Sequence, residues 1–258
     1  MFQELALLLT GLLGGTVGGL LGTGGCVIML PALAFLFGYN LPVAVGTTIT
    51  AVIITASSGA IGHLRMGNVD YGTAKVIAVS GAIGAFVGSL LFMFLAGNTS
   101  FLSLILGFAF LYVAIRMIYE GLKRFAGAKE GREIPGSFSK KSALGFLIGV
   151  LTGIVGLGGG YALVPSFIYL LGAPVKLAVG TSLASFISMA LVSGAFKLAQ
   201  GYVDVMAAIL LGIGTAVGAQ IGAKLVPKLP AWLIKLIFGM IFLYVSLKFV
   251  LMPLGIRI

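Results

Sequence analysis

The sequence predicts an all-α integral membrane protein that consists of two homologous repeats. The first observation is composition, since 60% of the 258 residues are hydrophobic and 9% are charged, whereas soluble domains carry about 25% charged residues. The second is the length of the apolar runs, which reach the roughly 20 residues that a helix needs to cross a bilayer. The third is that these runs occur in two similar sets. A soluble protein is excluded.

Each half contains four apolar segments that are separated by polar turns. The segments cover residues 4–38, 43–64, 72–96, 101–119, 142–172, 177–199, 205–226 and 231–251. The intervening turns carry Gly, Asn and Pro, which favour chain reversal. We therefore expect a transmembrane repeat at 1–119, a basic cytoplasmic linker at 120–141 and a second transmembrane repeat at 142–258.

The two halves match at a constant shift of 134 residues. Three motifs show this register. They are a Gly-rich motif with a proline five residues after Cys26 or Gly160, an Ala-Val-Gly-Thr motif and a Gly-x-Val-Asp motif. Their copies are Gly22–Pro31 with Gly156–Pro165, Ala44–Thr48 with Ala178–Ser182, and Gly67–Asp70 with Gly201–Asp204. Chance does not sustain so long a register, so the pattern indicates a duplicated unit.

The first segment of each half is too long for one upright membrane helix. It exceeds 30 residues, which is about 45–50 Å of helix at roughly 1.5 Å per residue, against a hydrocarbon core about 30 Å thick. Each segment is either one strongly tilted helix or two pieces joined at the Gly-rich motif. Glycine favours two pieces, because it costs a helix interior about 1 kcal/mol relative to alanine.

The direction of the chain after each break decides how the repeats are related. If each break turns the chain back, the eight segments make ten passes, and five passes per half make the repeats inverted. Four passes per half would instead make them parallel, and counting charges separates the two arrangements by a single residue. We favour inversion because of the segment lengths, and the parallel arrangement stays open.

The formal charge is +10, and 6 of the 16 basic residues cluster between the two halves. The basic residues of this polar segment are Lys123, Arg124, Lys129, Arg132, Lys140 and Lys141. This distribution is typical of a cytoplasmic loop under the positive-inside rule. It predicts no nucleic-acid partner. The surrounding lipid bilayer is the expected partner, and the oligomeric state stays open, a homo-oligomer included.

The two Gly-rich breaks are the candidate site. A helix that begins at Cys26 or Gly160 exposes the N–H groups of its first turn, and its dipole adds about half a positive charge there. Two such N-termini are expected to bind one small anion. The candidate ligands of the breaks are Gly22, Gly24, Gly25, Cys26, Gly156, Gly158, Gly159 and Gly160, and those of the following helices are Thr47, Thr48, Thr181 and Ser182.

Each part of this site has a structural alternative. Glycines also serve as small-residue packing positions, which is the interpretation that we prefer for the Gly-x-x-x-Gly pairs that begin at Gly15, Gly84 and Gly218. Hydroxyls in membrane helices often bond to their own backbone. Asp70 and Asp204 are suited to N-capping of the following helices.

Three basic residues lie beside the Gly-x-Val-Asp turns and are candidates for a gate or an anion funnel. They are His63, Arg65 and Lys197, of which His63 and Lys197 are equivalent in the two halves. Anchoring at the membrane interface by snorkelling is the interpretation that we favour for them. His63 is the only histidine, which argues against a histidine-based metal centre. We expect no metal, no cofactor and no catalytic residue.

The combination of motifs resembles the sulfite exporter TauE/SafE family. The similarity rests on Gly-x-Gly-Gly with its downstream proline, on Ala44–Thr48 and on His63–Asp70, with the matching copies in the second half. It covers essentially the whole chain and implies an exporter of a small sulfur-containing oxyanion, such as sulfite or a sulfonate, in a cell (plasma) membrane. Cys26 departs from the repeat, because the second copy has Gly160.

Two other functions compete with the transporter. An anion channel would place a fixed polar constriction at the same breaks. An intramembrane enzyme is disfavoured, because the chain lacks a Gly-x-Ser-Gly segment with a partner histidine. None of the six acidic residues falls in the middle of an apolar segment, which disfavours proton coupling through a buried carboxylate.

Overall fold

The computed structural model describes residues 2–123, 131, 133–156, 160–225 and 231–254. All regular structure in these ranges is helical, and they contain no β-strand. Seven helices within them are long and apolar enough to cross a membrane. The prediction of an all-α integral membrane protein is therefore confirmed.

The helices follow the predicted apolar segments closely. Those of the first half are α1 (Phe2–Leu21), α2 (Cys26–Pro31), the π-helix η1 (Ala32–Leu36), α3 (Leu41–Arg65), α4 (Tyr71–Leu95) and α5 (Thr99–Leu122). Those of the second half are α6 (Phe138–Val155), α7 (Gly160–Tyr169), α8 (Val175–Ala199), α9 (Val205–Leu225), α10 (Ala231–Leu251) and the short 3-10 helix η2 (Met252–Leu254). The long first segment of each half is divided at its Gly-rich motif.

Short polar side chains fix where several helices begin. Asp70 Oδ1 accepts the N–H of Thr73 at 3.0 Å at the start of α4, and Asp204 Oδ1 accepts the N–H of Ala207 at 2.9 Å at the start of α9. Each bond satisfies a first-turn donor that has no acceptor within its helix. The expected capping role of both aspartates is confirmed.

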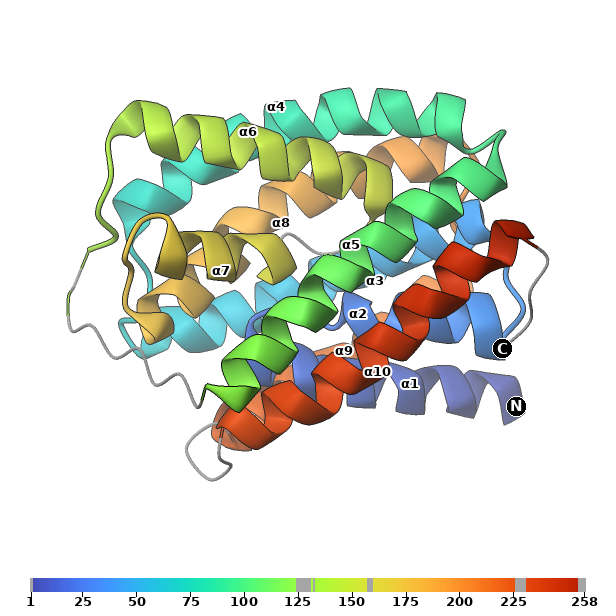
Figure 1. Cartoon of the computed structure of the whole chain (residues 1–258), viewed down its shortest axis with the longest axis horizontal. Helices are drawn as coiled ribbons and strands as arrows, with labels where there is room; N and C mark the ends of the chain where they lie inside the picture. The colour runs from blue at the N-terminus through green and yellow to red at the C-terminus, as the bar shows by residue number, and fades with distance from the viewer. Residues whose placement is uncertain (1, 124–130, 132, 157–159, 226–230, 255–258) are drawn as a thin grey trace.

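Helices α3 and α8 form the centre of the molecule. Their apolar windows are 67% and 61% buried, whereas the other candidate spans are between 33% and 50% buried. The helix pairs α1 with α9, α4 with α6 and α5 with α10 pack around them. Figure 1 shows α4 and α6 along one edge, α1 along the opposite edge and the α5–α10 pair crossing in front.

Glycine lets the outer helices pack backbone to backbone. A Cβ atom on Gly15 in α1 would overlap the carbonyl oxygen of Thr215 in α9, and one on Gly84 in α4 would overlap that of Phe146 in α6. The other members of the three Gly-x-x-x-Gly pairs make equivalent contacts: Gly19, Gly88, Gly218 and Gly222. Their predicted role in close helix packing is confirmed.

Polar contacts between helix termini distinguish two ends of the molecule. Lys235, at the start of α10, donates to Glu120, near the end of α5, at 2.8 Å. Ser103, near the start of α5, donates to the carbonyl of Phe249, near the end of α10, at 2.6 Å. Helices α5 and α10 are therefore antiparallel. We call the end where α5 ends and α6 begins the linker end; it lies at the left of Figure 1.

Candidate functional site

The first break is built from glycines in the left-handed backbone region. Helix α1 ends at Leu21, and φ is +73° at Gly22, +72° at Gly24 and +80° at Gly25. Residues with a Cβ rarely adopt this conformation, whereas glycine adopts it readily. The carbonyl of Gly25 then accepts the N–H groups of Ile28 and Met29, both at 3.2 Å, and so begins α2.

The chain turns back at this break. A Cβ on Gly18 would overlap the backbone nitrogen of Gly25, and a Cβ on Gly25 would meet the carbonyl of Gly14. The break therefore lies against the last turns of α1, and α2 packs on α1 and α3. These contacts agree with chain reversal at the first motif, and the number of passes stays a prediction.

The second break begins in the same way. Gly156 terminates α6 in the left-handed conformation, with φ of +64° and its N–H bonded to the carbonyl of Thr152 at 2.9 Å. Helix α7 begins at Gly160. The candidate residues Gly158 and Gly159 lie outside the described residues.

The two breaks meet in the interior of the protein. A Cβ on Gly160 would overlap the carbonyl oxygen of Gly22 and approach the Cα of Thr23. Gly22 and Gly160 are both buried, and Cys26 is fully buried with its Sγ donating to the Thr23 carbonyl at 3.3 Å. The first residue of α7 therefore lies directly against the backbone of the first break.

Two hydroxyl groups near this junction have no hydrogen-bond partner among the described residues. They are Thr23 Oγ1 in the first break and Thr48 Oγ1 in α3. Thr48 lies one turn before Val52, whose Cγ1 would be 3.0 Å from a Cβ on Gly24. A buried polar group without a partner is costly, so both hydroxyls are suited to a ligand.

Thr23 is the residue of the junction that the sequence analysis missed. The signal was available, because a threonine between Gly22 and Gly24 falls where the helix has ended. A threonine inside a membrane helix bonds its own backbone carbonyl four residues earlier. Thr23 is outside a helix, so its hydroxyl is left for another partner.

The candidates Thr47 and Thr181 contact the opposite half of the chain. Thr47 Oγ1 accepts the backbone N–H of Asp204 at 3.0 Å, and Thr181 Oγ1 accepts the backbone N–H of Asp70 at 2.9 Å. Both hydroxyls are fully buried, and each retains its own proton as a donor. The fourth candidate hydroxyl, that of Ser182, donates to the carbonyl of Val179 at 2.8 Å.

A basic side chain of each half packs against a glycine in the central helix of the other half. Lys197 packs its Cβ near Gly46 and His63 packs its Cβ near Gly180, at equivalent positions of the two halves. Lys197 is fully buried, so the expectation that it snorkels to the interface is wrong. His63 Nδ1 is also buried and has no partner among the described residues. Arg65 is exposed at the end of α3.

Two ionisable groups outside the membrane spans form hydrogen bonds with residues that are distant in the sequence. Burial by itself raises the pKa of Asp70. Hydrogen bonds from the Ile134 N–H and from Thr73, together with the charge of Lys141, outweigh burial, so the pKa lies below its ordinary value. Burial and the hydrogen bond to Asp204 raise the pKa of Tyr39 to about 12. The Tyr39 hydroxyl donates to Asp204 Oδ2 at 2.8 Å.

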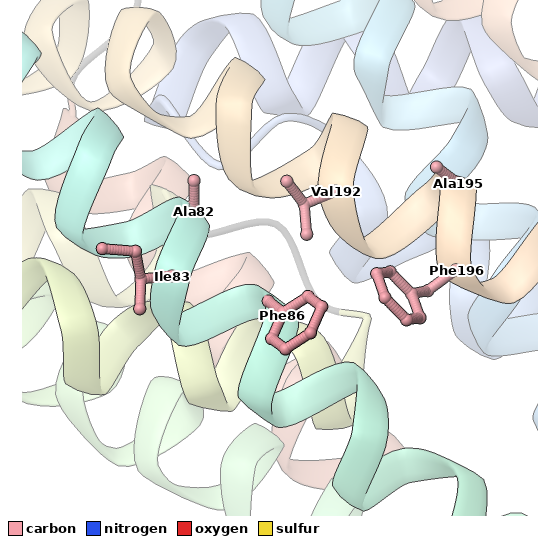
Figure 2. Close-up of a pocket in the computed structure, with 6 residues that line it drawn as sticks. All are labelled: Ala82, Ile83, Phe86, Val192, Ala195 and Phe196. Atoms are coloured by element: carbon pink, nitrogen blue, oxygen red, sulfur yellow. The ribbon is translucent and has the colours of Figure 1, made fainter.

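An open groove of about 480 Å³ lies between α4 and α8 and is unsuited to an anion. Figure 2 shows its lining of Ala82, Ile83, Phe86, Val192, Ala195 and Phe196. These side chains carry no charge and no hydrogen-bond donor, and Phe86 and Phe196 stack edge to face at 5.1 Å. The junction of the breaks remains the candidate site.

Fold and site together define a multi-pass helical membrane protein in which two broken helices meet. The chain belongs to the sulfite exporter TauE/SafE family, whose family model matches residues 7–249. The resemblance found in the motifs is therefore confirmed. No solved structure matches the chain.

Curated relatives cover most of the chain and share one description. A "probable membrane transporter protein" of Xylella fastidiosa (strain Temecula1 / ATCC 700964) is 33% identical over 184 residues, 70% of this chain and 69% of the relative. YjnA of Bacillus subtilis (strain 168) is 31% identical over 257 residues, 96% and 100% of the two chains. YunE of the same bacterium is 26% identical over 227 residues, 80% and 82%. The chain is a membrane transporter of this family.

Proposed function

We propose that the protein exports a small sulfur-containing oxyanion, such as sulfite or a sulfonate, and binds it where the two breaks meet. The observation that carries the proposal is the contact of Gly160 with the backbone of Gly22 and Thr23. Helix geometry leaves N–H donors at the start of α7, and the unpartnered hydroxyls of Thr23 and Thr48 add two more. These neutral donors suit the oxygens of a desolvated oxyanion.

We propose that the two halves form an inverted repeat of five passes each. The support is that contacts between the halves recur with their roles exchanged at the shift of 134. A Cβ on Gly46 would overlap the carbonyl of Tyr202, and one on Gly180 would overlap the carbonyl of Asn68. The antiparallel course of α5 and α10, which are equivalent helices, agrees with inversion. Alternating access would then consist of rocking one half against the other.

The linker end is proposed to face the cytoplasm. The basic residues of helix termini at this end are Arg65, Lys75, Lys123, Lys140, Lys141, Lys176 and Lys235. An excess of Lys and Arg marks the cytoplasmic side. We infer that the predicted linker at 120–141, of which residues 124–130 and 132 lie outside the described residues, faces the cytoplasm and that Arg65 attracts anions from this side.

His63 and Lys197 are proposed as gates on the two sides of the site. His63 packs against Gly180, which precedes Thr181, and Lys197 packs against Gly46, which precedes Thr47. In each case the glycine belongs to the opposite half. A side chain in this position is moved when one half moves against the other. This arrangement would let each basic group close one approach to the junction in turn.

Export driven by the membrane potential is sufficient for this function. The acidic side chains in the described part of the chain lie at helix ends or between helices: Glu4, Asp70, Glu120, Glu133 and Asp204. A carboxylate relay for protons is therefore not available there. One negative charge leaving an inside-negative cell gains about 2.3 kcal/mol per 100 mV, which corresponds to a concentration ratio of about fifty.

The test is flux of radiolabelled sulfite, sulfate and short sulfonates in proteoliposomes under an imposed potential. We expect saturable, potential-dependent sulfite flux with counterflow, and its loss in Gly24→Leu, whose side chain enters the junction toward Val52. The control is Gly67→Ala, at a turn with φ of +69° and open space around the site of the new Cβ. Flux without saturation or counterflow would indicate a channel, and unchanged flux in Gly24→Leu would refute the site.

A further inference from the structure

A buried lysine side chain lies beside the second break, outside the junction itself. Lys197 is fully buried at the end of α8. Its Nζ donates to the carbonyl oxygen of Gly153 in α6 and, at 3.0 Å, to Ser193 Oγ. The ring of Phe92 in α4 covers the ammonium group, with its centroid 4.3 Å from Nζ. Three helices therefore enclose the amino group of one lysine.

No carboxylate forms an ion pair with Lys197 in the part of the chain that the structure describes. An ammonium group has three donors, and the two acceptors recorded here are a carbonyl and a hydroxyl. A buried charge without a counter-ion is unfavourable, and in membrane proteins such residues usually serve a function. The enclosure therefore favours a mobile anion as the missing partner.

Two further hydroxyls without partners belong to residues that adjoin Gly153. Thr152 precedes Gly153 in α6, and the backbone nitrogen of Ser89 in α4 is close to the place of a Cβ on Gly153. Thr152 Oγ1 and Ser89 Oγ are buried and have no hydrogen-bond partner among the described residues. Each would gain a partner from an oxygen-rich ligand held by Lys197.

The residues around the Lys197 amino group are not repeated at the equivalent positions of the first half. At the shift of 134, the positions equivalent to Lys197, Ser193 and Thr152 are His63, Gly59 and Gly18. The first half therefore offers an imidazole and two glycines where the second half offers an ammonium and two hydroxyls. Packing requirements shared by the two halves do not account for this difference.

We propose that Lys197, Ser193, Ser89 and Thr152 form a second anion-binding subsite, in which the transported oxyanion takes the place of the Gly153 carbonyl. The proposal rests on the function proposed above, because it assigns the same substrate to a second position. Gly153 is three residues from the break at Gly156, so a movement of the end of α6 would withdraw its carbonyl and open the subsite. The oxyanion then passes between the junction and Lys197.

The test compares the KM for sulfite flux in proteoliposomes and the thermal stability of purified Lys197→Gln and Ser89→Ala/Thr152→Val. We expect KM to increase by about tenfold or more in Lys197→Gln and in the double variant, because each removes at least one hydrogen bond to a charged ligand. The double variant removes hydroxyls without partners and should keep its stability. Ser80→Ala is the control, because its hydroxyl already donates to the Val76 carbonyl in α4.

The outcomes separate the subsite from the proposed function. Absence of sulfite flux in the wild-type protein would refute the proposed function and the subsite with it. Wild-type flux with an unchanged KM in the double variant would overturn the subsite alone, and so would a Lys197→Gln protein that loses stability but keeps its KM. If Lys197→Gln does not fold, the double variant decides.

Discussion

Thr181 Oγ1 accepts the backbone N–H of Asp70 at 2.9 Å, although the two residues are 111 positions apart. The equivalent pair, Thr47 with Asp204, repeats this bond at 3.0 Å with the two halves exchanged. Each bond joins a central helix to the turn before an outer helix of the other half. The two hydroxyls thus fasten the halves together on both sides of the junction.

Thr181→Val and Thr47→Val should each destabilise the protein by about 1 kcal/mol, because a buried backbone N–H loses its acceptor. The two effects should be similar and nearly additive, since the pairs share no partner. Thermal unfolding of the purified variants measures both. Thr50→Val is the control, because the Thr50 hydroxyl bonds the Gly46 carbonyl of its own helix. A loss confined to one variant would contradict the equivalence of the pairs.

Gly25→Ala should be more damaging than Gly201→Ala, although φ is nearly the same at the two positions, +80° and +78°. The left-handed conformation costs either alanine about 1–2 kcal/mol. At Gly25 the new methyl group also meets the carbonyl of Gly14, whereas the space beside Gly201 is open. Comparison of stability and sulfite flux in the two variants isolates the packing at the break. Equal losses would show that this packing is unimportant.

Asp70 should stabilise the folded protein in a pH-dependent manner. Its folded-state pKa is below the ordinary value of 3.8, so its contribution is present above that pH and is lost as the pH falls through the lowered pKa. Acid unfolding of the wild-type protein and of Asp70→Asn should therefore converge at low pH. A stability difference that stays constant between neutral and acidic pH would contradict this prediction.

Tyr39 should have the opposite dependence at alkaline pH. Its folded-state pKa of about 12 exceeds the ordinary 10.0, so its contribution is complete below about pH 10 and is lost as the pH rises toward 12. The stability advantage of the wild-type protein over Tyr39→Phe should shrink in this range. Unfolding curves at a series of alkaline pH values test it, and an advantage that grows with pH would be inconsistent.

The positions of the breaks could be predicted from the sequence because glycine leaves a local signal. Clusters of glycine followed by a proline are unfavourable in any continuous helix, and both first segments are divided at these clusters. The capping roles of Asp70 and Asp204 are local for the same reason, since the donor lies three residues away in each case.

The surroundings of Lys197 could not be predicted in this way. Its carbonyl acceptor at Gly153 and its covering ring at Phe92 come from helices that are remote in the sequence. A lysine near a helix end is usually extended to the membrane surface, and no local pattern reports that α4 and α6 enclose this one. Burial of a charge depends on tertiary packing.

Equilibrium binding of radiolabelled sulfite to the purified protein tests the central claim that the junction of the breaks is the anion site. Gly160→Ala places a methyl group where the Gly22 carbonyl now lies, whereas Gly201→Ala alters a turn with open space around it. We predict saturable binding in the wild-type protein and in Gly201→Ala, and at least tenfold weaker binding in Gly160→Ala. Unchanged affinity in a folded Gly160→Ala protein would contradict the account.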